Sequence, residues 1–214
     1  MGEPGTQQII RMFERISLAI NSEKGRLSEL DGAIGDADHG ITMARGFSAV
    51  TKRLSGSNCE TLSPSEILRI AASTFLDAVG ASTGPLYATA FADAAQAVAG
   101  KDRLAVQEQA DLIAAFSSGI KRRGKGERGD KTMLDAWVPA AEAALRARAR
   151  DATAVEMWQD ILSAAETGCE STKSMVAARG RALRLGERSL GHIDPGAASA
   201  VVIIAAMKDT FIDS

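Results

Sequence analysis

Aromatic side chains are scarce in this sequence. They make up 4% of its 214 residues, although 45% of the residues are hydrophobic. Alanine supplies much of the apolar content; it is the strongest helix former, and its small side chain lets helices approach closely. Segments that alternate polar and apolar residues, hairpin turns, repeats and long linkers are also lacking. These absences argue against a sheet-based fold and predict one all-α domain over residues 1–214.

An excess of charge of one sign is lacking as well, because 25 basic residues face 27 acidic ones. Such a balance disfavours nucleic acid and anionic membranes as partners. The apolar run from Ala197 to Met207 is too short to cross a bilayer, and the N-terminus does not resemble a signal peptide. We therefore expect a cytoplasmic protein with no nucleic-acid or membrane partner.

Cysteine and histidine are too few to suggest a thiolate or imidazole metal site. Cys59 and Cys169 have no metal-ligand spacing and are interpreted as reduced structural thiols. His39 lies beside a group of aspartates, with no second His or Cys nearby to complete a zinc site. A phosphate contact or a loop-orienting role is the preferred interpretation of His39, and His192 is given no role.

Capping residues mark several helix starts. Ser63 and Glu66 form one capping box, with Pro64 at the first helical position, and Thr153 and Glu156 form a second. Further helices are expected around Ile9–Ile20, from Pro85 onward and over 103–122. A helix over 132–149 should be kinked or divided at Pro139, and a long helix over 154–184 should be interrupted at Gly168 or Gly180. Asp194-Pro195 should open the last helix. The reactive side chains are concentrated in the loops between these helices.

The first such loop is acidic. Asp31, Asp36 and Asp38 fall within eight residues, and hard oxygen ligands of this density suit Mg²⁺, Ca²⁺ or Mn²⁺. Three crowded carboxylates repel one another unless a cation neutralises them. In the alternative interpretation Asp38 caps the next helix and Asp36 forms a turn, which leaves the third aspartate unexplained.

The second loop, Gly80–Pro85, combines glycine, two hydroxyl residues and the start of a helix, where free N–H groups attract anions. Ser82 and Thr83 are therefore candidate phosphate contacts, or else ordinary helix caps. The loop differs from a Walker A motif because no Lys-Ser/Thr pair follows.

Two further loops are basic and rich in glycine. Residues 124–131 could form a mere surface loop in which Asp130 caps the next helix, and the turns around Arg181 and Gly186 could likewise be solvated. Together with the acidic loop they predict a nucleotide pocket instead. Metal ions and arginine would neutralise the phosphates, and Met133 or Leu134 would form an apolar wall for adenine.

The four blocks LDGAIGDADHG, GASTGPLY, GDKTMLDAW and GERSLGHIDPGAAS resemble, in this order, those of the L-type subunit of dihydroxyacetone kinases. The resemblance covers nearly the whole chain. It implies an antiparallel eight-helix barrel that binds ADP or ATP at one end. By resemblance, Asp31, Asp36 and Asp38 hold two Mg²⁺ ions. The implied nucleotide-contacting positions are His39, Thr42, Ser82, Thr83, Gly129, Met133, Arg181, Asp194, Pro195 and Gly196.

The sequence departs from the family pattern at three places. Ala37 stands where glycine is usual, Thr42 replaces a common asparagine, and the phosphate loop reads Gly-Ala-Ser-Thr-Gly. Ala37 requires either an ordinary backbone conformation or a strained one. Thr42 is expected to weaken a phosphate contact.

The resemblance also implies a partner subunit that holds the hydroxyketone covalently on a histidine. The phosphate comes either from a phosphocarrier protein of the phosphotransferase system, which re-phosphorylates retained ADP, or from exchanging ATP. We favour the phosphocarrier because free-standing subunits of this length are typical of that version. The alternatives are a non-catalytic nucleotide-sensing module and a Mg²⁺-dependent phosphohydrolase, for which His39 is the candidate base.

Overall fold

The computed structural model describes residues 3–56, 59–80 and 83–212. Within these ranges the chain forms α-helices and short 3₁₀ helices, and no strand is present. The α-helices are α1 (Gly5–Ile34), α2 (His39–Ser55), α3 (Pro64–Val79), α4 (Thr83–Ala97), α5 (Val106–Gly124), α6 (Leu134–Ala149), α7 (Ala154–Ser171) and α8 (Pro195–Ile212). The 3₁₀ helices are η1 (Cys59–Thr61), η2 (Thr172–Ser174) and η3 (Arg181–Ser189).

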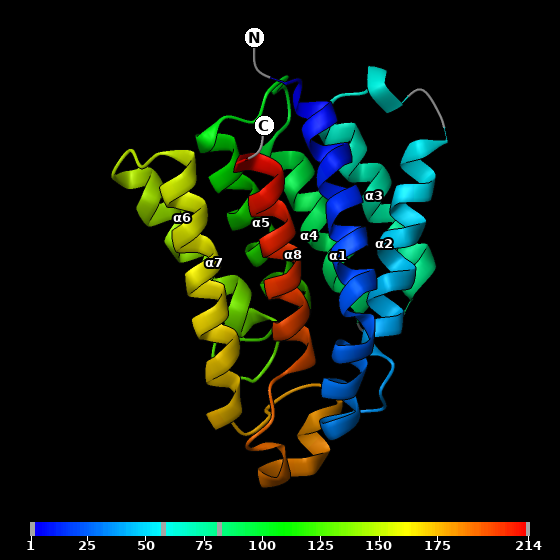
Figure 1. Ribbon diagram of the computed structural model, residues 1–214, viewed down its shortest axis with the longest axis vertical. Helices are drawn as coiled ribbons and strands as arrows, with labels where there is room; N and C mark the ends of the chain where they lie inside the picture. Colours follow the sequence, from blue (N-terminus) through cyan, green and yellow to red (C-terminus); the bar gives the residue numbers. More distant parts are fainter. Residues whose placement is uncertain (1–2, 57–58, 81–82, 213–214) are drawn as a thin grey trace.

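The eight α-helices form a closed, antiparallel ring (Figure 1). Each helix packs against the one before and the one after it, and α8 returns to pack against α1. The expected eight-helix barrel is therefore confirmed. Because successive helices run in opposite directions, every second connection lies at the same end. Loops 35–38, 125–133 and 172–194 lie at one end together with the end of α3 and the start of α4, which brings the described parts of the four sequence blocks together.

The predicted helix starts at both capping boxes are confirmed. At α3 the hydroxyl of Ser63 accepts a hydrogen bond from the Glu66 amide at 3.3 Å, and the Glu66 carboxylate accepts one from the Ser63 amide at 2.8 Å. Thr153 and Glu156 make the same pair of bonds at α7. Each box satisfies backbone donors that a helix start leaves free.

The barrel interior contains most of the few aromatic side chains. Phe13, Phe47, Phe75, Tyr87 and Phe91 contact one another with ring centroids 5.1 to 6.2 Å apart. These aromatic side chains come from α1, α2, α3 and α4, so their contacts connect four of the eight α-helices. Alanine and aliphatic side chains fill much of the remaining interior.

Helix α8, Pro195–Ile212, is long and apolar enough to cross a membrane. The shorter apolar run from Ala197 to Met207, considered from the sequence, did not indicate this. In the structure 67% of this stretch is buried. It packs against α1, α6 and α7, as a core helix does.

Some predicted boundaries were wrong. The expected helix 154–184 is interrupted at Ser171, with Gly168 still inside α7. The interruption follows from tertiary contacts, because the carbonyl of Thr172 accepts a hydrogen bond from the buried Lys131 side chain. Pro139 does not divide α6, which runs on to Ala149. The described part of α4 begins at Thr83 rather than Pro85, and α5 begins at Val106 rather than near 103.

Close helix packing generates a prediction at two helical glycines. A Cβ atom at Gly119 would lie 2.8 Å from Ala90 Cα on the neighbouring helix, whereas a Cβ at the exposed Gly25 meets nothing within 4 Å. Gly119→Ala is expected to lower the free energy of unfolding by about 1–3 kcal/mol, because α4 and α5 must move apart. Gly25→Ala is expected to raise it by about 0.5–1 kcal/mol through helix propensity alone.

Urea unfolding followed by circular dichroism measures both changes. Equal effects of the two substitutions would contradict the close approach of α4 and α5.

Candidate functional site

The acidic loop gathers the three predicted aspartates at the start of α2. Asp31, Asp36 and Asp38 each place a carboxylate oxygen within 4.8 Å of the others. Asp31 comes from the last turn of α1 and is 9% exposed, whereas Asp36 and Asp38 are exposed. Clustered oxygen ligands of this kind suit a hard divalent cation.

Asp31 also caps helix α2. One of its carboxylate oxygens accepts hydrogen bonds from the backbone amides of Asp38 at 2.9 Å and His39 at 3.1 Å. The alternative interpretation, in which Asp38 caps this helix, was therefore wrong, because the Asp38 side chain makes no capping bond. Any Cβ at Gly35 would lie 2.2 Å from the other Asp31 oxygen, so glycine is required beside this carboxylate.

The loop between these residues is strained at Ala37. Its φ of 62° lies in the left-handed region, which glycine adopts freely and alanine does not. Of the two backbone conformations expected for Ala37, which replaces the glycine usual in the family, the strained one is observed. It costs about 1 kcal/mol or more.

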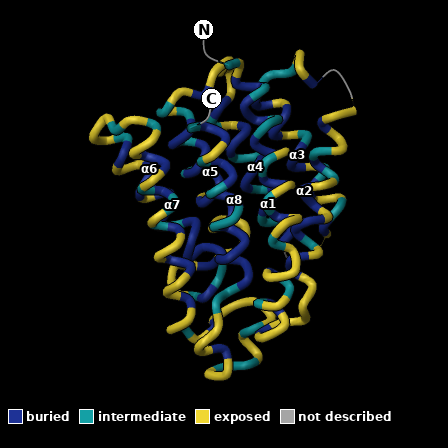
Figure 2. The backbone as a smooth tube through the Cα atoms, viewed as in Figure 1, coloured by how far each residue is buried: buried dark blue, intermediate teal, exposed yellow. Residues whose placement is uncertain are grey.

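Arg181 reaches the acidic loop from η3. Its guanidinium forms ion pairs with Asp36 and, at 3.6 Å, with Asp38. The segment that carries it, 172–194, is far from the acidic loop in sequence and lies beside it at the same end of the barrel (Figure 1), where much of the backbone is exposed (Figure 2). The structure thus places a cation directly on two of the three predicted metal ligands.

His39 begins α2 with its ring buried. Its Nε2 lies 2.9 Å from the hydroxyl of Ser199 on α8, and that hydroxyl donates to the Gly196 carbonyl at 2.9 Å. With the hydroxyl proton used there, Nε2 is the donor to Ser199. Burial lowers the pKa of His39 more than the Asp31 charge raises it, so the neutral ring is favoured. These contacts support the loop-orienting role, because the ring joins α2 to α8.

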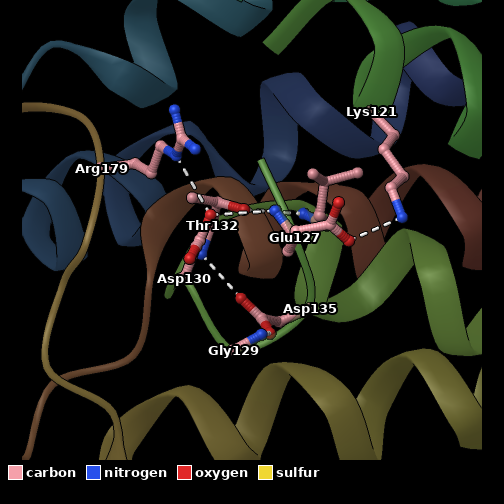
Figure 3. Close-up of polar contacts among 8 residues, drawn as sticks. Lys121, Glu127, Gly129, Asp130, Thr132, Asp135 and Arg179 are labelled. Atoms are coloured by element: carbon pink, nitrogen blue, oxygen red, sulfur yellow. Dashed lines mark hydrogen bonds and ion pairs between the residues drawn. The ribbon is translucent and has the colours of Figure 1, made fainter. Parts of the chain in front are cut away.

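Loop 125–133 is organised by two aspartates (Figure 3). The buried Asp135 accepts hydrogen bonds from the amides of Gly129 at 2.6 Å and Thr132 at 2.8 Å. Asp130 accepts one from the Glu127 amide at 2.9 Å and one from the Arg179 side chain at 3.1 Å. The surface-loop interpretation required Asp130 to cap α6, and this was wrong, because its carboxylate bonds Glu127 and Arg179 instead.

Lys131 lies at the centre of this loop and is only 1% exposed. Its ammonium donates hydrogen bonds to the carbonyls of Thr172 and His192, which lie at the two ends of the segment leading to α8. Burial lowers its pKa, while the charges of Asp194 and Asp135 raise it. The interpretation of this loop as a surface loop was therefore wrong for Lys131, because this side chain is buried.

The turn before α8 meets the same loop. Asp194 caps α8 by accepting a hydrogen bond from the Ala197 amide at 2.7 Å, next to Pro195 at the first helical position. A Cβ at Gly196 would lie 2.9 Å from Asp194 Oδ2, so glycine leaves room for this capping carboxylate, and it would be in ordinary contact, at 3.4 Å, with the backbone nitrogen and the Cβ of Met133. Gly129, with a φ of 98°, lies in the same loop as Met133.

The other predicted residues are placed less completely. Thr42 is half-buried in the first turn of α2, where its amide donates to the Asp38 carbonyl at 2.9 Å. Thr83 is buried at the start of α4, at the same end of the barrel. Ser82 lies outside the described residues. His192 contributes its carbonyl to Lys131, which is a structural role.

Sequence reasoning missed Lys131, Asp135 and Ser199. The available signal was the block GDKTMLDAW itself, in which a lysine and two aspartates surround a turn. Ser199 carried no signal, because serine inside an alanine-rich helix is common.

Comparisons with known proteins agree with this arrangement. Residues 33–209 match the DAK2 domain family. The ADP-binding DhaL subunit of the PEP-dependent dihydroxyacetone kinase of Escherichia coli is 38% identical over 197 residues, which are 92% of this chain and 93% of that protein. The chain belongs to the DhaL family.

One further relative supports this assignment, and a solved structure supports the fold. The ADP-binding DhaL subunit of the PTS-dependent dihydroxyacetone kinase of Lactococcus lactis is 37% identical over 94% of this chain and 95% of its own length. The crystal structure of the dihydroxyacetone kinase of C. freundii superposes with a TM-score of 0.72 at 22% identity. That match covers 94% of this chain but 34% of the larger kinase, and it supports the fold.

The electrostatics of Asp194 generate a prediction. Burial raises its pKa to about 7 from an ordinary value of 3.8, against the opposing effects of the Ala197 amide and the Lys131 charge. Between these values the unfolded chain releases the proton and the folded chain keeps it. Stability contributed by the protonated group is therefore complete below about pH 4 and is lost as the pH rises to about 7.

Asp194→Asn removes this titration but keeps an oxygen that can accept from Ala197. Relative to this variant, the wild-type protein should lose about 2–4 kcal/mol of unfolding free energy between pH 4 and pH 7.5. Urea unfolding at several pH values measures the difference. A difference that stays constant with pH would contradict the raised pKa.

Proposed function

We propose that this chain is the nucleotide-holding subunit of a dihydroxyacetone-type kinase. The observation that carries the proposal is the grouping of an acidic metal-ligand cluster, a helix start and a glycine-rich loop at one end of the barrel. Relatives that are similar over nearly their whole length support it, since they are named as ADP-binding subunits. We also propose that residues 1–214 form one domain of this type.

The acidic loop fits Mg²⁺ by the chemistry and spacing of its ligands. Asp31, Asp36 and Asp38 offer carboxylate oxygens within 4.8 Å of one another, and we propose that they hold two Mg²⁺ ions. When bound, these ions would neutralise charge on the nucleotide phosphates, which is the main requirement of phosphoryl transfer.

The remaining residues would bind and orient ADP or ATP. Thr83, at the start of α4, would offer its hydroxyl and backbone N–H to the phosphates, and Ser82 is proposed as a second phosphate contact from its place in the family motif. Arg181, which lies on Asp36 and Asp38, would supply a guanidinium to a phosphate oxygen. His39 orients the loop through Ser199.

The base would lie on the other side of the site. We propose that Met133 supplies an apolar face to the adenine ring and that Gly129 and the Asp194-Pro195-Gly196 turn border it, since Gly196 lies next to Met133 in space. We also propose that Thr42, in the first turn of α2, contacts the phosphates.

The acceptor is proposed to be a hydroxyketone held by a partner kinase subunit in the cytoplasm. We favour a phosphocarrier protein of the phosphotransferase system as the phosphate donor over ATP. The names of the relatives, PEP-dependent and PTS-dependent kinases, support this choice.

Two other functions use the same site. A nucleotide-sensing module would bind nucleotide without transferring phosphate to any partner. A phosphohydrolase would turn over nucleotide alone with His39 as base, yet its buried ring and its bond to Ser199 favour an orienting role.

Nucleotide retention tests the proposal. The chain purified in Mg²⁺ is expected to carry ADP that exchanges slowly with labelled ATP, and rapid exchange would instead indicate an ATP-dependent kinase. Asp36→Asn should weaken Mg²⁺-dependent ADP binding at least about tenfold, because a metal ligand is lost.

Asp209→Asn is a matched control that removes an exposed carboxylate at the far end of α8. It should leave ADP binding unchanged. Unaltered binding in Asp36→Asn would contradict the metal site, and absence of nucleotide even with added Mg²⁺ would contradict the function.

A further inference from the structure

The segment that joins η2 to α8, residues 175–193, is called the strap here because it crosses the site end of the barrel. The residues that flank it in η2 are hydrogen-bonded, directly or through Lys131, to its C-terminal end. The Gly191 amide donates to the Lys173 carbonyl at 2.8 Å, and the Lys131 ammonium holds the carbonyls of Thr172 and His192. The base of the strap is therefore fixed to the buried part of loop 125–133.

A second set of hydrogen bonds holds the strap just before Arg181, the residue that forms its tip. The Ala178 amide donates to the Asp130 carbonyl at 3.0 Å, and the Arg179 side chain donates to the Asp130 carboxylate at 3.1 Å (Figure 3). Two residues further on, Arg181 turns to the other side of the site and pairs with Asp36 and Asp38. The strap thus connects the loop with the buried lysine to the acidic loop.

The contact at the tip differs from those at the base. The Arg181 side chain is 62% exposed, and those of Asp36 and Asp38 are 47% and 57% exposed. Exposed ion pairs are weak and exchange readily, whereas the buried Lys131 contacts do not. The strap therefore has a fixed base and a tip that can be released.

Arg181 and a divalent metal compete for the same two carboxylates. The guanidinium lies on one oxygen of Asp36 and one of Asp38, and a metal bound by these aspartates would contact carboxylate oxygens of the same pair. Two cations on one pair of carboxylates repel each other. Metal binding and pairing with Arg181 therefore weaken each other at Asp36 and Asp38.

We infer that Arg181 is an internal counter-cation, which neutralises Asp36 and Asp38 in the metal-free protein and is displaced when a divalent metal binds there. This inference rests on the proposed function, which assigns these aspartates to the metal. Displacement frees the guanidinium at the moment when phosphate arrives with the metal. Metal loading and release of the strap tip are thus coupled, and the coupling is reciprocal.

The inference predicts opposite changes in two affinities for one substitution. Arg181→Met removes the competing charge, so Mn²⁺ should bind the nucleotide-free protein about three- to tenfold more tightly, the range expected for one or two exposed ion pairs. The same variant should bind ADP more weakly in the presence of Mg²⁺, because the phosphates lose a guanidinium. A residue with a merely structural role would weaken both.

The experiment titrates Mn²⁺ into nucleotide-stripped full-length protein and measures free Mn²⁺ by electron paramagnetic resonance. Arg184→Met is the matched control, because it removes the same charge from the same strap. Within the described part of the chain, Arg184 forms no ion pair. Its Mn²⁺ affinity should stay within about twofold of wild type. Arg181→Lys, which keeps the charge, should fall between wild type and Arg181→Met.

Equal or weaker Mn²⁺ binding by Arg181→Met would overturn the inference, and so would an equal gain in Arg184→Met. Failure of every variant to bind Mn²⁺ would overturn it as well, since the freed carboxylates must then accept the metal. The proposed function is judged separately, by ADP retention in the wild-type protein. Retained ADP with unchanged Mn²⁺ affinity in Arg181→Met would sustain that function and reject the counter-cation.

Discussion

The close approach of neighbouring helices is the constraint on which the rest of this structure depends. Eight helices can close into a ring only if each pair of neighbours packs tightly, and small residues stand at those contacts. A Cβ at Gly119 would meet the backbone of α4, one at Gly40 would lie 2.1 Å from the Lys24 carbonyl on α1, and one at Gly168 would lie 1.9 Å from the Asp135 carbonyl on α6. The last contact is helped by Pro139, which has no N–H to offer that carbonyl. The ring in turn fixes which loops share an end.

Within that end, charge is balanced in two different ways. On one side the buried Lys131 lies near Asp135 and Asp194, and its hydrogen bonds go to backbone carbonyls that cannot move independently of the fold. On the other side Arg181 pairs with exposed aspartates on a loop strained at Ala37. Buried charges are costly to disturb, whereas exposed pairs exchange at little cost. The first side is therefore suited to holding a shape, and the second to exchanging one cation for another.

The sequence predicted what depends on local rules. Both capping boxes, the start of α8 at Asp194-Pro195 and the grouping of the three aspartates follow from residues a few positions apart. It failed where a distant residue decides the outcome. Lys131 resembled a solvated loop lysine because its partners, Thr172 and His192, lie more than 40 residues away. The end of α7 was misplaced for the same reason. The capping role of Asp31 was missed because it lies seven positions before Asp38, whose amide it bonds.

The two sides of the site are joined by two routes of unequal strength, and this bears on how a nucleotide would be held. One route runs through the buried side chains His39, Ser199 and Tyr87, which tie α2 to α8 and α4 inside the barrel. The other runs over the surface through the strap, from Lys131 to Arg181. A ligand with an apolar ring at one end and charged phosphates at the other would have to contact both sides at once. The buried route lies inside the barrel, whereas the Arg181 pairs of the strap are exposed, so adjustment to a ligand costs less at the strap. An element that adjusts must be held by contacts weaker than those the ligand offers, and the exposed pairs of Arg181 meet that condition.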